Sequence, residues 1–333
     1  MTACSSRIPV ISVCPCIILS MLILRENQKE NKTMPGTLYL CATPIGNLED
    51  ITYRVVRILG EADLIAAEDT RNSIRLLNHF RIRTPLTSYH EYNKYDKGKK
   101  LVEQLLEGKN IALITDAGTP GISDPGEELV RMCCEAGIPV TSLPGPAACI
   151  TALTISGLPT RRFAFEAFLP TEKKEREEIL QELERETRTI ILYEAPHRLV
   201  KTLKLLSERL GNRKAAVCRE LTKKYETALR AGLQDAAAYY ETHEPKGECV
   251  IVIEGRSRED LEREKRAEWE NMSIEDHVQY YLSQGYDRKE ALKRTGRDRG
   301  VSKRDIYNYL EQQKKSTLTS ASSSVTEMSM LPM

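Results

Sequence analysis

The sequence predicts an α/β protein in which two α/β domains precede a small helical appendage. Over the first half of the chain, short apolar runs alternate with amphipathic stretches, whereas in the second half several apolar runs follow one another directly. After Gly255 the composition becomes strongly charged. Apolar residues make up 41% and charged residues 29% of the 333 positions, which is typical of a globular protein long enough for two domains.

The domain boundaries follow these changes in pattern. We expect a leader over residues 1–34, an N-terminal α/β domain over 35–150 and a C-terminal α/β domain over 151–256. A charged linker is expected over 257–272, a small domain of three short helical segments over 273–314 and a disordered, Ser/Thr-rich tail over 315–333.

The first α/β domain is predicted to contain parallel βαβ units, because its strands and helices alternate. Apolar residues recur at helical spacing in the first amphipathic stretch, as Val55, Ile58 and Leu59 illustrate. The expected strands cover residues 37–44, 63–70, 84–91, 110–116 and 138–146, and the expected helices cover 48–62, 73–80, 99–109 and 126–137.

The second α/β domain is predicted to have a mixed sheet, because some of its strands lack an intervening helix. The break between the domains is expected at residues 151–160. The expected strands cover residues 161–170, 187–196, 213–221, 226–233 and 246–255, and the expected helices cover 173–186 and 197–211.

The leader contains an apolar run, IPVISVCPCIILSMLIL, over residues 8–24. This run is broken by two prolines and is shorter than the roughly 20 residues of a membrane-spanning helix. No A-x-A cleavage site follows it, so it is a poor signal peptide. We favour an upstream in-frame extension over the alternative, a membrane anchor.

Composition restricts the location and the partners of the protein. Nine cysteines without a C-x-x-C pair predict reduced thiols in a cytoplasmic protein. The five histidines are scattered, so we expect no metal site. Because the net charge is only +1, any nucleic-acid contact must come from a local basic patch.

Glycine and proline occur at the ends of five expected strands, and they are most frequent in ITDAGTPGISDPG, residues 114–126. The first strand is not followed by G-x-G-x-x-G, and no G-x-x-x-x-G-K-[ST] occurs, so neither a dinucleotide nor an ATP site is predicted. A parallel sheet nevertheless places its ligand at the carboxyl ends of its strands. Turn formation alone is the alternative explanation for any single loop.

Seven blocks carry a family resemblance over residues 36–255: TLYLCATPIGNLEDIT, ADLIAAEDTRNSIRLL, ALITDAGTPGISDPGEELVR, SLPGPAACITALTISGLPT, ILYEAPHRL, CRELTKKYE and GECVIVIEG. Together they resemble the tetrapyrrole methylase family of S-adenosylmethionine-dependent methyltransferases, whose two α/β domains hold the cofactor in the cleft between them. The match is closest to the bacterial branch that 2′-O-methylates a ribose, a cytidine of the decoding region, in small-subunit ribosomal RNA.

The resemblance implies S-adenosylmethionine as the cofactor and assigns residues to its site. In the first domain these are Pro44, Asp116, Ala117, Gly118, Thr119, Ile122, Ser123, Leu143, Gly145, Pro146 and Ala147. In the second domain they are Tyr193, Glu194, Ala195, Glu220, Leu221, Gly247 and Glu248. Adenosylmethionine has no phosphates, and glycine-rich loops let backbone groups approach it directly.

A ribose hydroxyl that attacks a methyl group must lose a proton, which a positioned side chain can accept. The candidates for this role are Glu68, Asp69, Glu220 and Lys223, the last only if burial lowers its pKa. For each of them a salt bridge or a helix cap is the competing interpretation.

RNA binding is predicted for two basic regions. Arg71 and Arg75 lie at helical spacing in the first domain, and residues 288–304 of the appendage hold eight Lys or Arg against Glu290 and Asp298. The appendage, residues 273–314, resembles the small helix-turn-helix-like domain found in this bacterial branch. Its candidates for RNA binding are Arg288, Lys289, Lys293, Arg294 and Arg297.

The expected partners are small-subunit ribosomal RNA or the assembled small ribosomal subunit, and a second copy of the chain in a homodimer. DNA and a membrane are not expected as partners. A corrin or porphyrin C-methylase and a non-enzymatic, RNA-binding ribosome assembly factor are the alternatives.

Overall fold

A computed structural model of the protein describes residues 34–257, 259–261, 263, 269 and 271–313. Two compact units account for them. The first unit comprises residues up to Thr151 together with Glu220–Glu226, and the second comprises Ala152–Arg219 and the residues from Thr227 onward. The predictions for the leader up to residue 33 and for the tail from 315 lie outside the described residues.

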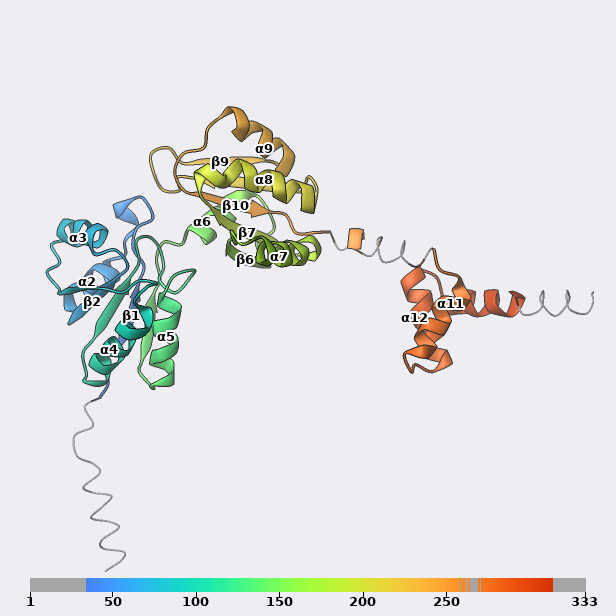
Figure 1. The fold of residues 1–333 in the computed structure, drawn as a ribbon, viewed down its shortest axis with the longest axis horizontal. Helices are drawn as coiled ribbons and strands as arrows, with labels where there is room; N and C mark the ends of the chain where they lie inside the picture. Colours follow the sequence, from blue (N-terminus) through green and yellow to red (C-terminus); the bar gives the residue numbers. More distant parts are fainter. Residues whose placement is uncertain (1–33, 258, 262, 264–268, 270, 314–333) are drawn as a thin grey trace, which may run out of the picture. The chain divides into compact units, whose positions relative to one another are not determined.

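The first unit contains a five-stranded, fully parallel sheet (Figure 1). Its strand order is β3-β2-β4-β1-β5. The strands are β1 (Leu38–Cys41), β2 (Leu64–Ala67), β3 (Leu86–Ser88), β4 (Ile111–Ile114) and β5 (Val140–Leu143).

Helices cover both faces of this sheet, as the alternating pattern predicts. Leu59 of α2 and Leu77 of α3 pack on one face, while Leu101 of α4 and Leu129 of α5 pack on the other. The helix after β1 and the helix after β4 therefore lie on opposite faces, which makes the crevice outside the carboxyl ends of these neighbouring strands the expected ligand site. The helices are α2 (Tyr53–Glu61), α3 (Thr70–His79), α4 (Lys94–Leu106) and α5 (Gly126–Glu135), and a short 3-10 helix, η1, covers Leu48–Asp50.

The second unit contains a mixed five-stranded sheet of order β6-β7-β10-β8-β9. The pair β6–β7 is parallel, and the other pairs are antiparallel, which confirms the prediction of a mixed sheet. The strands are β6 (Phe163–Phe168), β7 (Thr189–Glu194), β8 (Lys214–Arg219), β9 (Thr227–Gly232) and β10 (Cys249–Ile253).

Three helices bury one face of the second sheet in a single apolar core. Leu183 of α7, Leu203 of α8 and Leu233 of α9 all belong to this core. Cys218 of β8 points to a different helix and donates a long sulfur hydrogen bond, 3.9 Å, to the Ala152 carbonyl of α6. The helices are α6 (Ala148–Ser156), α7 (Lys173–Arg185), α8 (Pro196–Leu210) and α9 (Leu233–Thr242).

The sequence did not predict two of these helices. The expected break at 151–160 lies largely in α6, whose sequence, ACITALTIS, is mostly apolar and lacks an amphipathic pattern. Helix α9 consists mainly of small residues and tyrosines, and it follows directly on a strand. The expected strands are also several residues too long, because their Gly- and Pro-rich ends form loops instead of ladder positions.

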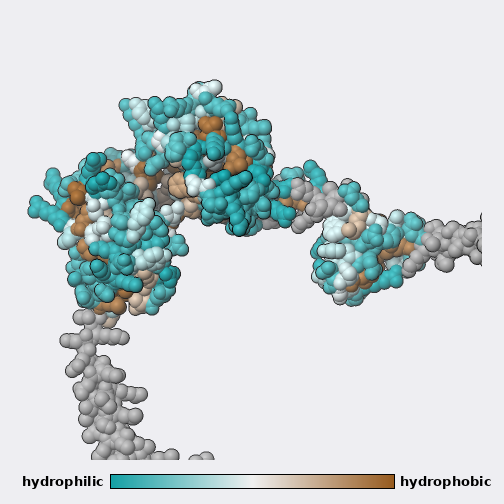
Figure 2. Space-filling model, viewed as in Figure 1, coloured by the Kyte–Doolittle hydropathy of each residue, from teal (hydrophilic) through white to brown (hydrophobic). Residues whose placement is uncertain are grey.

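The carboxy-terminal segment has a small core of its own. Val278 of α11 (Ile274–Ser283), Leu292 of α12 (Arg288–Arg299) and Ile306 pack together, and residues 303–313 form a third helix, which confirms three helical segments. Figure 2 shows that hydrophilic side chains cover most of the visible face of each part, with only small apolar patches.

The buried carboxylate of Glu194 provides a test of this fold. Its side chain is almost fully buried and accepts a hydrogen bond of 2.6 Å from Thr202 Oγ1. We expect Thr202→Val to lower the free energy of unfolding by about 1–3 kcal/mol, because it leaves a buried acceptor short of a donor. Urea denaturation measures this loss. The control Ser207→Ala removes an exposed hydroxyl from the same helix and should change little, and an equal loss in both variants would contradict the prediction.

Candidate functional site

Two backbone hydrogen bonds tie together the loops that follow β1 and β4. The Thr43 amide donates to the Gly118 carbonyl at 2.9 Å, and the Gly118 amide donates back to the Thr43 carbonyl at 3.0 Å. The Thr43 hydroxyl also donates to the Thr115 carbonyl. The two loops at the expected crevice therefore form one braced structure.

The loop after β4 takes its shape from one carboxylate and three left-handed residues. Asp124 accepts hydrogen bonds from the amides of Gly121, Ile122 and Gly126 at 2.7–3.2 Å. Gly118, Gly121 and Ser123 have positive φ angles of 86°, 86° and 64°. A non-glycine residue in this region costs free energy, and such strain clusters at binding sites. We did not predict a role for Asp124, although an Asp followed by Pro-Gly is a turn signal.

The loop after β5 joins the same structure. Thr119 Oγ1 donates to the Pro146 carbonyl at 2.9 Å. A Cβ atom on Gly145 would lie 2.6 Å from that of Ala42, so only glycine fits where the two loops pass. The structure thus brings together the residues predicted in the first domain: Pro44, Asp116, Ala117, Gly118, Thr119, Ile122, Ser123, Leu143, Gly145, Pro146 and Ala147.

The segment Glu220–Glu226 was expected as part of the second domain, but it groups with the first unit. Its residues press on the β1 loop, because a Cβ on Gly46 would lie 2.4 Å from the Lys223 side chain and 3.0 Å from the Leu221 carbonyl. Glu220 and Thr222 are both left-handed, with φ angles of 51° and 65°. The Thr222 hydroxyl is buried and has no hydrogen-bond partner among the described residues.

The remaining predicted cofactor residues meet at one edge of the second sheet. Cys249, at the start of β10, pairs with Glu194 at the end of β7 and with Arg219 at the end of β8. Tyr193 and Ala195 flank Glu194, and Gly247 and Glu248 immediately precede Cys249. The Glu194 carboxylate is occupied inside the unit by the Ala195 amide, Thr202 and Arg198, which leaves backbone groups to face a ligand.

Asp69 has a structural role in addition to being a candidate general base. Its carboxylate caps helix α3 by accepting from the Arg71 amide at 2.8 Å, and it pairs with the Arg71 guanidinium at 2.9 Å. These hydrogen bonds from Arg71 hold the pKa of Asp69 below its ordinary value. A carboxylate with a lowered pKa is a weaker proton acceptor, so Asp69 is the poorer base.

Glu68 has the opposite environment. Its carboxyl is half-buried, and burial raises its pKa, with further contributions from the negative charges of Asp116 and Asp124. Asp116 also accepts a hydrogen bond of 3.2 Å from the Asp69 amide, so this aspartate connects the β4 loop to the loop after β2. Of the acidic candidates, Glu68 fits a general base best, because its proton affinity is shifted towards neutral pH.

Glu220 and Lys223 form an ion pair with each other at 2.9 Å. Lys223 acts as a hydrogen-bond donor in this pair. The Lys223 side chain lies against the Gly46 position, so this ion pair is next to the β1 loop.

The residues predicted to contact RNA differ in whether an acidic side chain already pairs with them. Arg75 is exposed and has no ion-pair partner among the described residues, whereas Arg71 pairs with Asp69. In the appendage, Arg294 lies 4.0 Å from the ring centre of Tyr286 and pairs with Glu290, so it supports the fold. Three others form surface ion pairs, which are either longer than 3.5 Å or made with the next residue in the chain. These are Arg288 with Glu311 at 3.9 Å, Lys293 with Glu290 at 3.6 Å and Arg297 with Asp298 at 3.4 Å. Lys289 is exposed, without such a pair in the described part of the chain.

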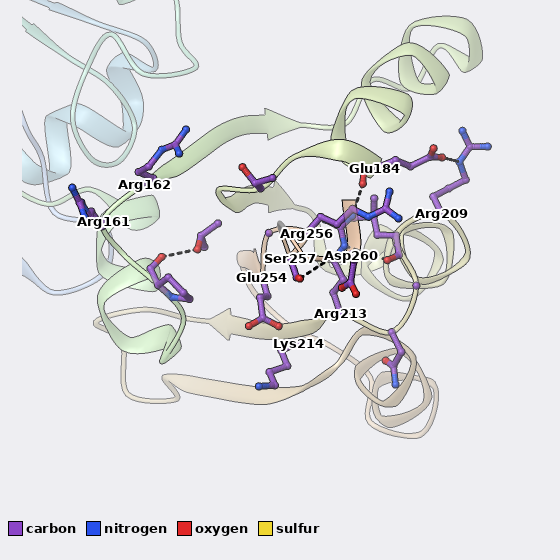
Figure 3. A pocket seen from close by; sticks show the side chains of 17 residues that line it. Arg161, Arg162, Glu184, Arg209, Arg213, Lys214, Glu254, Arg256, Ser257 and Asp260 are labelled. Carbon is purple, nitrogen blue, oxygen red and sulfur yellow. Dashed lines mark hydrogen bonds and ion pairs between the residues drawn. The ribbon is translucent and has the colours of Figure 1, made fainter. Parts of the chain in front are cut away.

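A pocket of about 1230 Å³ lies at the opposite edge of the second sheet (Figure 3). Arg209 pairs there with Glu184, and Arg213 donates to the carbonyls of Glu184 and Leu210. Burial and the nearby Arg256 lower the pKa of Arg213. Figure 3 shows Arg161 and Arg162 set apart from Arg213 and Arg256. None of the residues predicted for the cofactor lines this pocket.

Within residues 34–313, as far as they are described, no three His, Cys, Asp or Glu side chains gather in a way that would hold a metal ion. None of the helices in the described part of the chain is long and apolar enough to cross a membrane.

The chain belongs to the family of tetrapyrrole (corrin/porphyrin) methylases, whose family model matches residues 37–237. Three bacterial proteins named ribosomal RNA small subunit methyltransferase I are similar to it over most of their length. The protein of Halalkalibacterium halodurans is 51% identical over 86% of this chain and 97% of its own. That of Bacillus subtilis is 45% identical over 86% and 98%, and that of Escherichia coli O157:H7 is 42% identical over 87% and 100%.

Solved structures of other proteins share the fold. A diphthine synthase superposes with a TM-score of 0.56 at 13% sequence identity, over 67% of this chain and 91% of its own. Cobalt precorrin-4 methyltransferase, a cobalamin biosynthetic enzyme, superposes with a TM-score of 0.50 at 17% identity, over 66% and 94%. At these identities the likeness concerns the fold alone.

The pKa of Glu68 provides a test of the site. We expect Asp116→Asn to lower this pKa towards its ordinary value, because it removes a neighbouring negative charge. Carboxyl carbon chemical shifts followed through a pH titration measure the change. In the native protein the folded state binds this proton more tightly than the unfolded chain does. The stability contributed by Glu68 should therefore be present at low pH and decline as pH rises through the raised pKa. A pKa that does not move in the variant would contradict the coupling.

Proposed function

We propose that this protein transfers a methyl group from S-adenosylmethionine to a ribose 2′-hydroxyl of small-subunit ribosomal RNA. The observation that carries the proposal is the identity of 42–51%, over 86–87% of the chain, with relatives named ribosomal RNA small subunit methyltransferase I. The fold adds a physical reason, since the tied glycine-rich loops lie at the carboxyl ends of β1 and β4.

The loops suit a cofactor without phosphates. Gly118 and Gly121 adopt a backbone conformation that side chains disfavour, so the loop can approach a ligand without a Cβ atom in the way, and the crowding at Gly145 leaves room for backbone alone. The buried Thr222 hydroxyl, which lacks a partner among the described residues, is a further group that a polar ligand would satisfy. S-adenosylmethionine supplies an electrophilic methyl group and a neutral leaving group. The protein is therefore required mainly to align the ribose and to accept its proton.

In this account Glu68 accepts the proton of the ribose hydroxyl, since its raised pKa makes it the best acceptor of the candidates. Asp69 holds the loop through α3, and the Glu220–Lys223 pair orients the substrate. The appendage, Arg71 and Arg75 contribute phosphate contacts. A cytidine of the decoding region as the target, the assembled small subunit as the substrate, a homodimer and a cytoplasmic location complete the proposal.

The proposal is tested by mapping ribose methylation in small-subunit ribosomal RNA from cells with and without the gene. The loss of one 2′-O-methyl group on deletion, restored by the wild-type chain, supports it. An unchanged methylation map, or methylation of a tetrapyrrole by the purified protein, would contradict it.

Gly118 is the most direct test of the cofactor loops. We expect Gly118→Ala to weaken S-adenosylmethionine binding by about 10-fold or more, because a side chain strains the left-handed backbone that meets the ligand. Calorimetric titration measures the affinity. Gly137→Ala is the matched control, since Gly137 is also left-handed, at φ 68°, and has open space around it at the far end of α5. It should cost about 1 kcal/mol of stability and leave affinity unchanged. Equal affinities in the two variants would show that the loop is only structural.

Substitutions of Glu68 and Asp69, the two acids that follow β2, should have different effects on the rate of methyl transfer. Glu68→Gln should reduce kcat by about 100-fold with little change in cofactor affinity, because it removes the proton acceptor. Asp69→Asn should mainly lower stability through the loss of the α3 cap, with a smaller effect on kcat. Single-turnover methyl transfer and thermal unfolding measure the two quantities. A larger kinetic loss in Asp69→Asn would reverse the assignment.

Salt dependence tests the appendage. The variant Lys289→Gln, Lys293→Gln, Arg297→Gln should flatten the salt dependence of RNA binding by about two units of slope, because each phosphate contact contributes slightly less than one. The control variant Arg57→Gln, Lys109→Gln, Arg131→Gln removes three surface cations of the first unit, each of which pairs with a nearby carboxylate. It should leave the slope unchanged. Equal slopes in all proteins would move the RNA contact away from the appendage.

A further inference from the structure

A bulge at the end of β6 exposes an aromatic ring. The register of β6 with β7 shifts between Phe165 and Phe168, and Ala167 between them is left-handed, with a φ angle of 49°. Bulges re-aim side chains and are enriched next to functional sites. Phe168 is 50% exposed, and its ring centre lies 5.7 Å from that of Tyr193, the first of the cofactor residues predicted in the second unit. A large apolar side chain is therefore presented to solvent beside the predicted site.

A basic groove begins at the residue after Phe168. It has a volume of about 820 Å³ and is lined by Leu169 and Thr171 from the turn after β6, by Arg176 of α7, and by one side of α8. Arg176 donates to the carbonyls of Pro170 and Thr171. Arg198 of α8 donates to the Leu169 carbonyl, so the groove wall is held by two guanidinium groups.

The positive charge of this groove is largely uncompensated. Within the described residues, Arg176 donates hydrogen bonds to carbonyl oxygens and has an electrostatic interaction with Glu172 but no ion pair within 4 Å. Lys201 and His197 have no ion-pair or hydrogen-bond partner for their side chains in the same part of the chain. Arg198 and Lys204 are paired, with Glu194 and Glu241. Glu208 is the single acidic residue in the lining. An anion that enters the groove would therefore find cations that the fold does not neutralise.

An exposed aromatic ring next to free cations is the combination that recognises unpaired nucleic acid, in which bases stack on rings and phosphates contact Lys and Arg. The groove begins where β6 and β7 end, at the sheet edge that holds Tyr193–Ala195. We propose that Phe168 and the groove between α7 and α8 bind an unpaired nucleotide of the RNA substrate, with its base on Phe168 and its phosphate at Lys201 and Arg176. This proposal rests on the proposed function and adds a site in the second unit, separate from the appendage and from Arg71 and Arg75.

The test uses the full chain and an unpaired RNA of about 12 nucleotides, within the range that single-strand-binding folds cover. Phe168→Leu should weaken binding of this RNA by about 10-fold, since it removes a stacking surface, and Phe168→Trp should retain binding. Phe163→Leu is the matched control, because Phe163 lies at the other end of the same strand and is 38% exposed. It should bind like the wild type.

The second part of the test changes the charge of the groove. Lys201→Glu should lower RNA affinity and flatten its salt dependence by about one unit of slope, whereas Lys201→Arg should bind RNA normally. Lys214→Glu, at the start of β8, makes the same charge change at the opposite edge of the second sheet and should have no effect on RNA binding. Cofactor affinity should be the same in all of these variants. A fully paired RNA duplex should not distinguish Phe168→Leu from the wild type.

Equal RNA affinities in Phe168→Leu and Phe163→Leu, with a wild type that binds RNA and methylates it, would overturn this inference and leave the proposed function intact. A wild type that neither binds nor methylates the RNA of the small subunit would instead overturn the proposed function and this inference with it. A changed oligomeric state in Phe168→Leu, measured by sedimentation, with RNA affinity intact, would assign the surface to a protein contact and overturn the inference as well.

Discussion

The pair of hydrogen bonds between Thr43 and Gly118 is the constraint on which the rest of the site depends. It fixes the loop after β1 to the loop after β4, at the point where the chain leaves the first sheet towards opposite faces. Thr119 then connects the β4 loop to Pro146, and Asp116 connects it to the loop after β2. Four strand ends therefore hold one another, and a ligand would meet a surface of backbone groups whose positions are set before binding.

The acidic loop shows how one short sequence can provide two different carboxylates. Glu68 and Asp69 are neighbours, yet burial and the charge of Asp116 raise the pKa of Glu68, while hydrogen bonds from Arg71 lower that of Asp69. The two pKa values differ because the side chains lie in different places. Glu68 is near Asp116 of the β4 loop, whereas Asp69 caps the start of α3. A candidate proton acceptor and a structural cap are thus adjacent in the sequence but differ in pKa.

The sequence was sufficient to predict the parallel sheet, the mixed sheet and the glycine-rich loops, because periodicity and turn residues are local signals. It did not reveal α6, which is mostly apolar and lacks an amphipathic pattern. Nor did it reveal the grouping of Glu220–Glu226 with the first unit, which depends on contacts with Gly46 far away in the chain. The role of Asp124 and the exposure of Phe168 were also missed, since the first requires the loop geometry and the second requires a bulge. Local patterns predict elements, whereas contacts between distant loops decide which residues form the site.

Hydrogen exchange of the full chain, with and without S-adenosylmethionine, tests the central claim most directly, because the claim is that backbone groups of the tied loops meet the cofactor. The account predicts slower exchange on binding in residues 43–47, 116–123 and 144–147, with no change in the pocket around Arg213 and Arg256 at the opposite edge of the second sheet. Protection confined to that pocket, or no protection in the three loops at saturating cofactor, would contradict it.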